Sequence, residues 1–307
     1  MKLSRNGFIR ARNFIMNNAR PLDQSLFRYH FENGSKEDVM EELSKFQNPD
    51  GGFGHGIEPD LRLSASSPFA TSVGLQYYIE ANGDAESDMV KMAIEYLVST
   101  YDAENDFWPF TFLDVNDEAH APWWHLEKIE PPKDDRWANP SAEIAGYLAR
   151  YSHYVPKEIL ANVNRRVNAI LNQSEDIVGS LYGFLCWHRV RNFFPEPIRS
   201  ELVRKLGRTI DRIVPTLAEN MGEIRIFWLV SDTNSLLLSH PEFVYRMLEK
   251  EIGLQAEDGG WWPTWKWMQY EEVWPIAEKE WAGRMTYACL RTLRALNLNN
   301  RLIEQFE

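Results

Sequence analysis

Residues 46–53 read FQNPDGGF and residues 254–261 read LQAEDGGW, and each follows a segment with apolar residues at helical spacing. A fainter copy, YDAENDFWPF, occupies residues 101–110 after the helical pattern of residues 86–100. Asp-Gly-Gly favours a tight turn, because glycine accepts positive φ and aspartate can bond nearby backbone amides. We therefore expect a repeated unit of roughly 50 residues, in which the glutamine and the aromatic residue tie one helix pair to the next.

Two kinds of helical pattern alternate outside these turns. Residues 157–171 and 197–214 carry apolar side chains on one face, as does the helix that begins after Ser35, where Asp38 completes a capping box. Residues 68–80, 140–151 and 282–296 are apolar or small on nearly every side, which is typical of buried helices. Strand-like alternation is almost absent. We predict an all-α protein with an inner layer of buried helices and an outer layer of amphipathic ones.

The turn motif also carries a resemblance to a family. The Q-x-x-D-G-G-[FW] spacing at residues 47–53 and 255–261 resembles the QW repeat of the squalene cyclase and protein prenyltransferase superfamily. The resemblance implies an α/α toroid, with inner and outer helices around a central cavity. On this basis we expect one domain over residues 1–307 with roughly five to six helix pairs.

The catalytic motifs of that superfamily do not match this sequence. No D-x-D-D string occurs, and DDRWA at residues 134–138 lacks the last aspartate of D-D-x-x-D. Neither Cys186 nor Cys289 follows an aspartate two residues earlier, as the zinc site of the prenyltransferases requires. The resemblance therefore implies a fold. The activities that these motifs support, those of class II terpene cyclases, class I terpene synthases and protein prenyltransferases, are not carried over residue by residue.

Composition limits the classes of partner. The 307 residues carry a formal charge of −12, with 44% hydrophobic and 25% charged residues, which is typical of a globular protein. The acidic balance argues against nucleic acid and anionic membranes, and no apolar run is long enough for a membrane span. We expect a cytoplasmic protein with a small-molecule substrate and neither cofactor nor metal. The oligomeric state stays open.

The most polar segment follows the first turn, in GHGIEPDLRLSASSP. It brings an imidazole, two carboxyl groups and a guanidinium together within eight residues: His55, Glu58, Asp60 and Arg62. These groups supply a general acid, a general base and an anion-binding group, and His55 titrates nearest to neutrality. We predict His55, Glu58 and Asp60 as catalytic residues and Arg62 as substrate-binding. Pairing of Arg62 with either carboxylate would instead make the segment structural.

All but two of the twelve tryptophans lie in two connecting segments. Indole rings combine a large apolar area with an N–H donor, so they suit the lining of a pocket. We predict that Trp123, Trp124, Trp261, Trp262 and Trp281 contact substrate. An alternative is that they hold long loops against the helices. Residues 108–138 have few helical cues and are predicted to form a long loop or a lid.

Polar residues near the starts of the buried helices complete the predicted site. Asn139 is a plausible N-cap before Pro140, which places Glu143 in the first turn, and Glu280 and Arg284 flank Trp281. Helix capping explains such carboxylates without any function. If they face a cavity, a pair of carboxylates about 5–9 Å apart suits glycoside chemistry.

Three functions remain open at this point. The first is a terpenoid cyclase-like enzyme that protonates an olefin and holds the cation among aromatic rings, and we favour it because of the turn motif. The second is a carbohydrate-active hydrolase or lyase with tryptophan platforms and two carboxylates. The third is a non-catalytic protein that binds a ligand or a partner.

Overall fold

The computed structural model describes residues 1–177, 179–220, 225–297 and 301–304. Over these residues the chain forms α-helices and short 3-10 helices, and the only β-type pairings are isolated bridges. The α-helices are α1 (Arg5–Asn18), α2 (Pro21–Phe31), α3 (Lys36–Ser44), α4 (Pro68–Glu80), α5 (Asp88–Ser99), α6 (Ala138–Arg150), α7 (Lys157–Leu171), α8 (Leu181–Val190), α9 (Ile198–Asn220), α10 (Ile226–Leu229), α11 (Pro241–Ile252) and α12 (Trp274–Ala295). The all-α prediction is confirmed.

The chain divides into two compact units. Unit 1 consists of residues 1–39 and 210–307, and unit 2 consists of residues 40–209, so the boundaries fall within α3 and α9. The toroid and the single domain that the family resemblance implies stay predictions. None of the described helices is both long enough and apolar enough to cross a bilayer.

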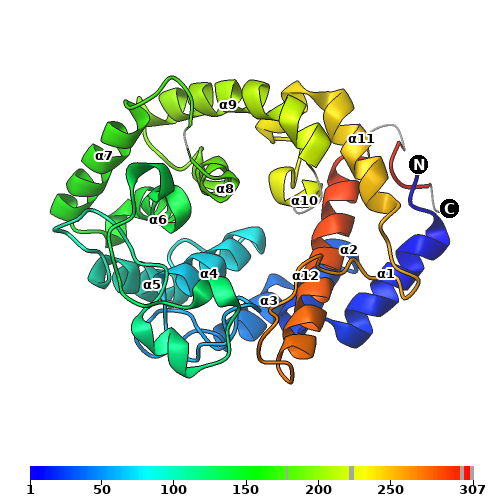
Figure 1. Ribbon diagram of the computed structural model, residues 1–307. Helices are drawn as coiled ribbons and strands as arrows, with labels where there is room; N and C mark the ends of the chain where they lie inside the picture. Colours follow the sequence, from blue (N-terminus) through cyan, green and yellow to red (C-terminus); the bar gives the residue numbers. More distant parts are fainter. Residues whose placement is uncertain (178, 221–224, 298–300, 305–307) are drawn as a thin grey trace. The chain divides into compact units, whose positions relative to one another are not determined.

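Unit 2 is built around two buried helices. Helix α4 packs against α5 and α6, and α6 also packs against α7 and α8 (Figure 1). Nine of the thirteen residues of α4 are buried, as its apolar pattern predicts. In contrast, α7 buries only one stripe, formed by Val163, Val167 and Leu171, and leaves Arg165 exposed.

Unit 1 is organised around the long helix α12, which packs against α1, α2 and α10. The sequence pattern placed the start of this helix at residue 282, but α12 begins at Trp274. Pro275 in its first turn explains the earlier start, because proline needs no N–H partner there and its φ suits a helix. The apolar pattern does not extend over this turn, because charged residues lie between Pro275 and Trp281.

The capping box predicted at the start of α3 is present. The Asp38 amide donates to Ser35 Oγ at 3.1 Å, and the Ser35 amide donates to Asp38 Oδ2 at 3.4 Å. The repeated Asp-Gly-Gly turns also share one geometry. Gly51 has a φ of 90° and Gly259 a φ of 95°. In each turn the aspartate side chain accepts a hydrogen bond at 2.9 Å from the backbone N–H of the second glycine.

The glutamine of each turn joins it to a second helix. Gln47 Nε2 donates to the carbonyl oxygen of Gly51 and to that of Met89 in α5, both at 2.9 Å. Gln255 Nε2 donates to the carbonyl oxygen of Gly259 at 3.0 Å and to that of Gly7 in α1 at 2.8 Å. The tie between neighbouring helices that the sequence predicts is therefore confirmed for the glutamines.

The aromatic residue after each turn is joined to the following buried helix. In each case its backbone N–H donates to a side-chain hydroxyl of that helix. The pairs are Phe53 with Thr71 at 2.9 Å, Trp108 with Ser141 at 3.1 Å and Trp261 with Thr286 at 2.9 Å. The faint copy at residues 101–110 therefore ends in the same contact as the two clear copies.

Candidate functional site

The sequence-predicted site residues fall into both units. Unit 2 contains His55, Glu58, Asp60, Arg62, Trp123, Trp124, Asn139 and Glu143. Unit 1 contains Trp261, Trp262, Glu280, Trp281 and Arg284. Within unit 2, the loop of residues 54–66 lies against residues 118–121. The Ala121 amide donates to the Asp60 carbonyl at 2.8 Å, and the Arg62 amide donates to the Ala119 carbonyl at 3.0 Å.

The two predicted catalytic carboxyl groups are buried in this loop. Glu58 is 9% exposed and Asp60 is 4% exposed, although both lie in a connecting segment. The two residues belong to one turn, in which the Leu61 amide donates to the Glu58 carbonyl at 3.0 Å. The Arg62 guanidinium lies over Gly56, where a Cβ atom would be 3.1 Å from its central carbon. The loop is therefore compact and holds its carboxyl groups away from bulk water.

His55 differs from its neighbours because it lies at the surface. It is exposed, has a φ of 54°, and its Nε2 is 2.8 Å from Asn48 Oδ1. The imidazole is thus held by the turn residue Asn48 and faces solvent, which leaves the two carboxyl groups as the better-enclosed candidates for catalysis.

His120 is a buried imidazole beside this loop. It is 2% exposed, and its Nδ1 donates to the Glu118 carbonyl oxygen at 2.7 Å. The His125 ring stacks on it with centroids 5.7 Å apart. Leu61 and His120 form an antiparallel bridge, so the loop and this imidazole are neighbours. Sequence spacing could not reveal this, because residues 61 and 120 are far apart in the chain.

An aromatic cluster adjoins the same two segments. The Phe69 amide donates to the Phe110 carbonyl at 3.0 Å, and the Trp124 ring lies 4.6 Å from the Phe69 ring and 5.8 Å from the Phe110 ring. Trp124 is 9% exposed, and its Nε1 is buried without a hydrogen-bond acceptor among the described residues. Trp123 next to it is 53% exposed. Trp124 therefore belongs to the cluster and Trp123 to the surface.

Asn139 and Glu143 have partners other than the predicted ones. Asn139 has an extended conformation just before the regular part of α6, but its Oδ1 accepts from the Cys186 thiol at 3.6 Å and no side-chain cap is formed. The Glu143 carboxylate is 2% exposed and accepts from Tyr147 at 2.7 Å and from Arg189 at 2.8 Å. These contacts join α6 to α8 in the core. Burial and the charge of Glu143 raise the pKa of the Cys186 thiol, so it is not activated as a nucleophile.

Of the first pair of unit 1 candidates, Trp261 lies in the core of that unit and Trp262 at its edge. Trp261 is fully buried and its Nε1 donates to the Glu251 carbonyl at 2.8 Å. Trp262 is half-buried, its ring meets Phe14 edge-on at 5.5 Å, and its Nε1 donates to Asp258 at 3.0 Å. Both indoles have their donors satisfied, which fits the alternative in which tryptophans hold a loop against helices.

The candidates on α12 lie beside a further tryptophan. Trp281 and Trp265 meet edge-on with centroids 5.4 Å apart, and both indole nitrogens are buried without an acceptor in the described part of the chain. Glu280 is half-buried. Arg284 is also half-buried, with one guanidinium nitrogen 3.9 Å from the fully buried carboxylate of Asp23. Arg284 is therefore held by α2, in which Asp23 lies.

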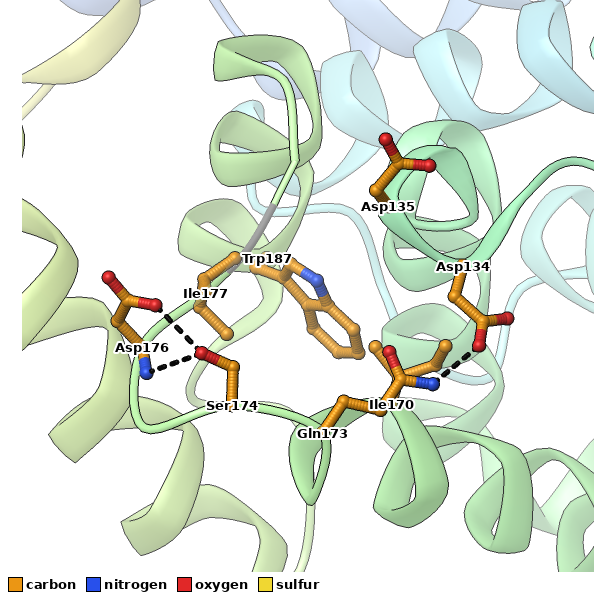
Figure 2. Close-up of a pocket in the computed structure, with 8 residues that line it drawn as sticks. All are labelled: Asp134, Asp135, Ile170, Gln173, Ser174, Asp176, Ile177 and Trp187. Atoms are coloured by element: carbon orange, nitrogen blue, oxygen red, sulfur yellow. Dashed lines mark hydrogen bonds between the residues drawn. The ribbon is translucent and has the colours of Figure 1, made fainter.

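A pocket of about 330 Å³ in unit 2 was missed by the sequence interpretation. Figure 2 shows its lining, which comes from the 3-10 helix η3 (Asp134–Arg136), the end of α7, the following loop and α8. The lining residues are Asp134, Asp135, Ile170, Gln173, Ser174, Asp176, Ile177 and Trp187. Only the fold brings the acidic pair at residues 134–135 to the same pocket as Trp187.

Between α5 and α6, residues 108–137 form no α-helix and contain three 3-10 helices, η3 among them. The other two are η1 (Leu113–Asp117) and η2 (Pro122–Trp124). The role of this segment as a lid stays a prediction. In the described part of the chain, no group of three or more histidine, cysteine or acidic side chains has the arrangement of a metal site. No protein-family model matches this chain, and a comparison with curated proteins finds no match.

Proposed function

We propose that this chain is a small-molecule enzyme of terpenoid cyclase-like type, with its acid-base chemistry in the loop of residues 54–66. A carboxyl group of Glu58 or Asp60 donates a proton to an olefin of an apolar substrate, and aromatic rings hold the cation that forms. The observation that carries this proposal is the burial of both carboxyl groups in a loop that is paired with the segment bearing His120 and Trp124.

Burial supports the chemistry because a carbocation is captured by any water that reaches it. Asp60 is 4% exposed and Glu58 is 9% exposed, so proton transfer occurs in a site from which bulk water is largely excluded. His120 Nδ1 donates to a backbone carbonyl, and in this proposal the imidazole takes up the proton through its other ring nitrogen. The proton added to the olefin can thus be returned to the protein after cyclisation, and the reaction is an isomerisation.

The aromatic cluster of Phe69, Phe110 and Trp124 supports an apolar, cation-forming substrate. Ring faces stabilise a nearby cation by about 0.5–2 kcal/mol each, and tryptophan is the strongest of the three ring types. The unsatisfied Trp124 Nε1 offers one donor for a polar end of the substrate. The acidic surface of the chain favours a neutral olefin over a diphosphate.

The test is turnover of linear polyprenes without a diphosphate, followed by mass spectrometry of cyclised products. Asp60→Asn and Glu58→Gln keep the shape of each side chain and remove the proton donor. We expect the variant of the true acid to lose about 10²–10⁴-fold in rate. Asp117→Asn, an exposed carboxylate in the same unit, is the matched control and should keep full activity.

Two outcomes would contradict the proposal. Inactivity of the folded wild-type chain over all polyprene lengths is one, and two-fold or smaller effects of both carboxyl variants are the other. If the polyprenes raise the melting temperature of an inactive chain, the non-catalytic binding function replaces this proposal.

A further inference from the structure

The loop of residues 54–66 is closed near its end at Ser64. The His55 amide donates to the Ser64 carbonyl oxygen at 3.3 Å, and Asn48 Nδ2 donates to the same oxygen at 3.0 Å. The two carboxyl groups of the proposed acid chemistry lie between these two positions of the chain. A contact that holds Ser64 therefore holds the base of the segment that carries them.

The side chain of Glu118 makes such a contact. Its Oε1 accepts from the Ser64 amide at 2.9 Å, and its Oε2 accepts from the Ser64 hydroxyl at 2.8 Å. Both bonds go to a carboxylate, and such charge-assisted hydrogen bonds are roughly twice as strong as neutral ones. Because the two residues are 54 positions apart in the chain, this contact joins the loop to the segment that carries His120.

The Glu118 carboxylate continues a backbone pairing at the point where the pairing ends. Leu61 and His120 form an antiparallel bridge, and the regular antiparallel pattern would next bond the Ser64 amide to the carbonyl oxygen of Asp117. Asp117 instead ends the 3-10 helix η1, and the Ser64 amide donates to the Glu118 side chain. The carboxylate thus takes the place of a backbone acceptor and extends the contact between the loop and its neighbouring segment.

The backbone of Glu118 holds the other member of the proposed acid-base pair. Its carbonyl oxygen accepts from Nδ1 of the buried His120 at 2.7 Å. A carbonyl oxygen can only accept, so Nδ1 carries a proton and the bond orients the ring. One residue therefore contacts the acidic loop through its side chain and the imidazole through its carbonyl oxygen.

We propose that Glu118 is a positioning residue, which holds the acidic loop in register with the imidazole of His120. This inference rests on the proposed acid-base function of the loop. Glu118 acts through Ser64, because its carboxylate keeps the base of the loop beside residues 118–121. The acid and the imidazole must reach one substrate in turn, and a misplacement of about 1 Å can cost about 10²-fold in rate.

Hydrogen exchange measures the contact without any substrate. Glu118→Ala removes both acceptors of Ser64, whereas Glu118→Gln keeps an oxygen for the Ser64 amide. The Arg62 and Ala121 amides donate across the pairing, so their exchange, followed by NMR spectroscopy, should be faster by about tenfold in the alanine variant and close to wild type in the glutamine variant. Glu127→Ala removes an exposed carboxylate from the same connecting segment and should change neither rate. Unchanged exchange in Glu118→Ala would overturn the proposal.

The kinetics of polyprene turnover separate positioning from a structural role. Measured well below the melting temperature, Glu118→Ala should lower kcat by about 10–100-fold and leave KM nearly unchanged, because the acid is displaced while the aromatic cluster still binds the substrate. Glu118→Gln should restore most of kcat. A glutamate that only stabilises the fold would lower the melting temperature of Glu118→Ala and leave kcat as it is. That result, or a glutamine variant as slow as the alanine variant, contradicts the positioning role.

The two measurements also distinguish this inference from the proposed function. If the folded wild-type chain turns over no polyprene, the proposed function is wrong, and hydrogen exchange still shows whether Glu118 holds the loop. If the wild-type chain is active and Glu118→Ala matches it in both exchange and kcat, the positioning role alone is wrong.

Discussion

The two Asp-Gly-Gly turns have the same backbone hydrogen bonds but support different structures. In unit 2 the residue after the glutamine is Asn48, whose Nδ2 donates to the Ser64 carbonyl and to Ser66 Oγ, both at 3.0 Å. In unit 1 the equivalent residue is Ala256, which has no side-chain donor. The first turn is therefore bonded to the end of the candidate loop that contains these serines, whereas Ala256 gives the second turn no such side-chain bond.

The two turns also differ at the aromatic position, where the polar side chain is in unit 1. Phe53 has no polar atom, whereas Trp261 donates to the carbonyl of Glu251, whose buried carboxylate pairs with Arg225. Two positions within one repeated motif thus decide whether the turn supports a polar loop or a buried ion pair. The repeat thus builds the fold, while residues that vary inside it determine what is attached to the fold.

The largest expected effect is loss of the buried ion pair in unit 1. Arg225 and Glu251 are 4% and 3% exposed, and Arg225 also donates to the Trp262 carbonyl at 3.0 Å. Arg225→Ala leaves the Glu251 charge buried without its partner, so we expect a loss of about 3–5 kcal/mol in unfolding free energy. Urea denaturation measures it. Arg199→Ala, which breaks an exposed pair with Glu196, is the control and should cost at most about 1 kcal/mol.

The second effect is a pH dependence that comes from unit 2. Burial, with the positive charges of Arg191 and Arg189, lowers the pKa of His188 from 6.5 to about 3. Between these values the unfolded chain binds more protons than the folded one, so the unfolding free energy falls as the pH decreases. We expect a loss of about 2 kcal/mol between pH 7 and pH 5.

Denaturation of His188→Gln at both pH values isolates this contribution. The variant should lose most of that pH dependence, because glutamine does not titrate. The histidines of unit 1, His30 and His240, are partly exposed and remain in the variant. If the variant keeps the full pH dependence, another group is responsible and His188 is not the pH-sensitive site.

The third effect tests whether the two turns are equivalent. Thr71→Val and Thr286→Val each remove the hydroxyl that accepts the amide of the aromatic residue, at 2.9 Å in both cases. A buried N–H without a partner costs about 1–3 kcal/mol, so we expect similar losses of stability from the two variants. Serine at either position retains the hydroxyl and serves as the control. A large loss from only one valine variant would show that the turns are not equivalent.

The sequence predicted the helices better than the site because helices depend on neighbouring residues. The buried helix α4 was predicted with its bounds, since almost all of its thirteen consecutive residues are apolar or small, which is the pattern of a buried helix. The start of α12 was missed because its first turns are charged, and propensity is weak where packing decides.

The site depends on contacts between distant residues, and no local pattern encodes those. Glu58 and Asp60 were recognised because acidic residues beside glycines and proline stand out in one short segment. Their burial and the approach of His120 could not be predicted, since both require residues 119–121 to pair with residues 60–62. The Trp187 pocket was missed for the same reason, because its acidic wall and its indole are about fifty positions apart in the chain.

The smallest expected change in stability, and the sharpest test of the comparison, comes from the residue after the glutamine. Asn48 is half-buried and holds His55 as well as the two serines, so Asn48→Ala removes bonds at the edge of the loop and should cost about 1 kcal/mol. Its local effect should be larger, because residues 54–66 lose their connection to the turn and exchange their amide hydrogens faster by tenfold or more. Ala256→Asn makes the reverse change in unit 1 and should alter stability and exchange less, because Ala256 has no side-chain hydrogen bond to lose. Hydrogen exchange followed by mass spectrometry compares the two variants directly. If Asn48→Ala leaves exchange in residues 54–66 unchanged, the turn does not order the candidate loop, and the difference between the two copies of the motif has no bearing on function.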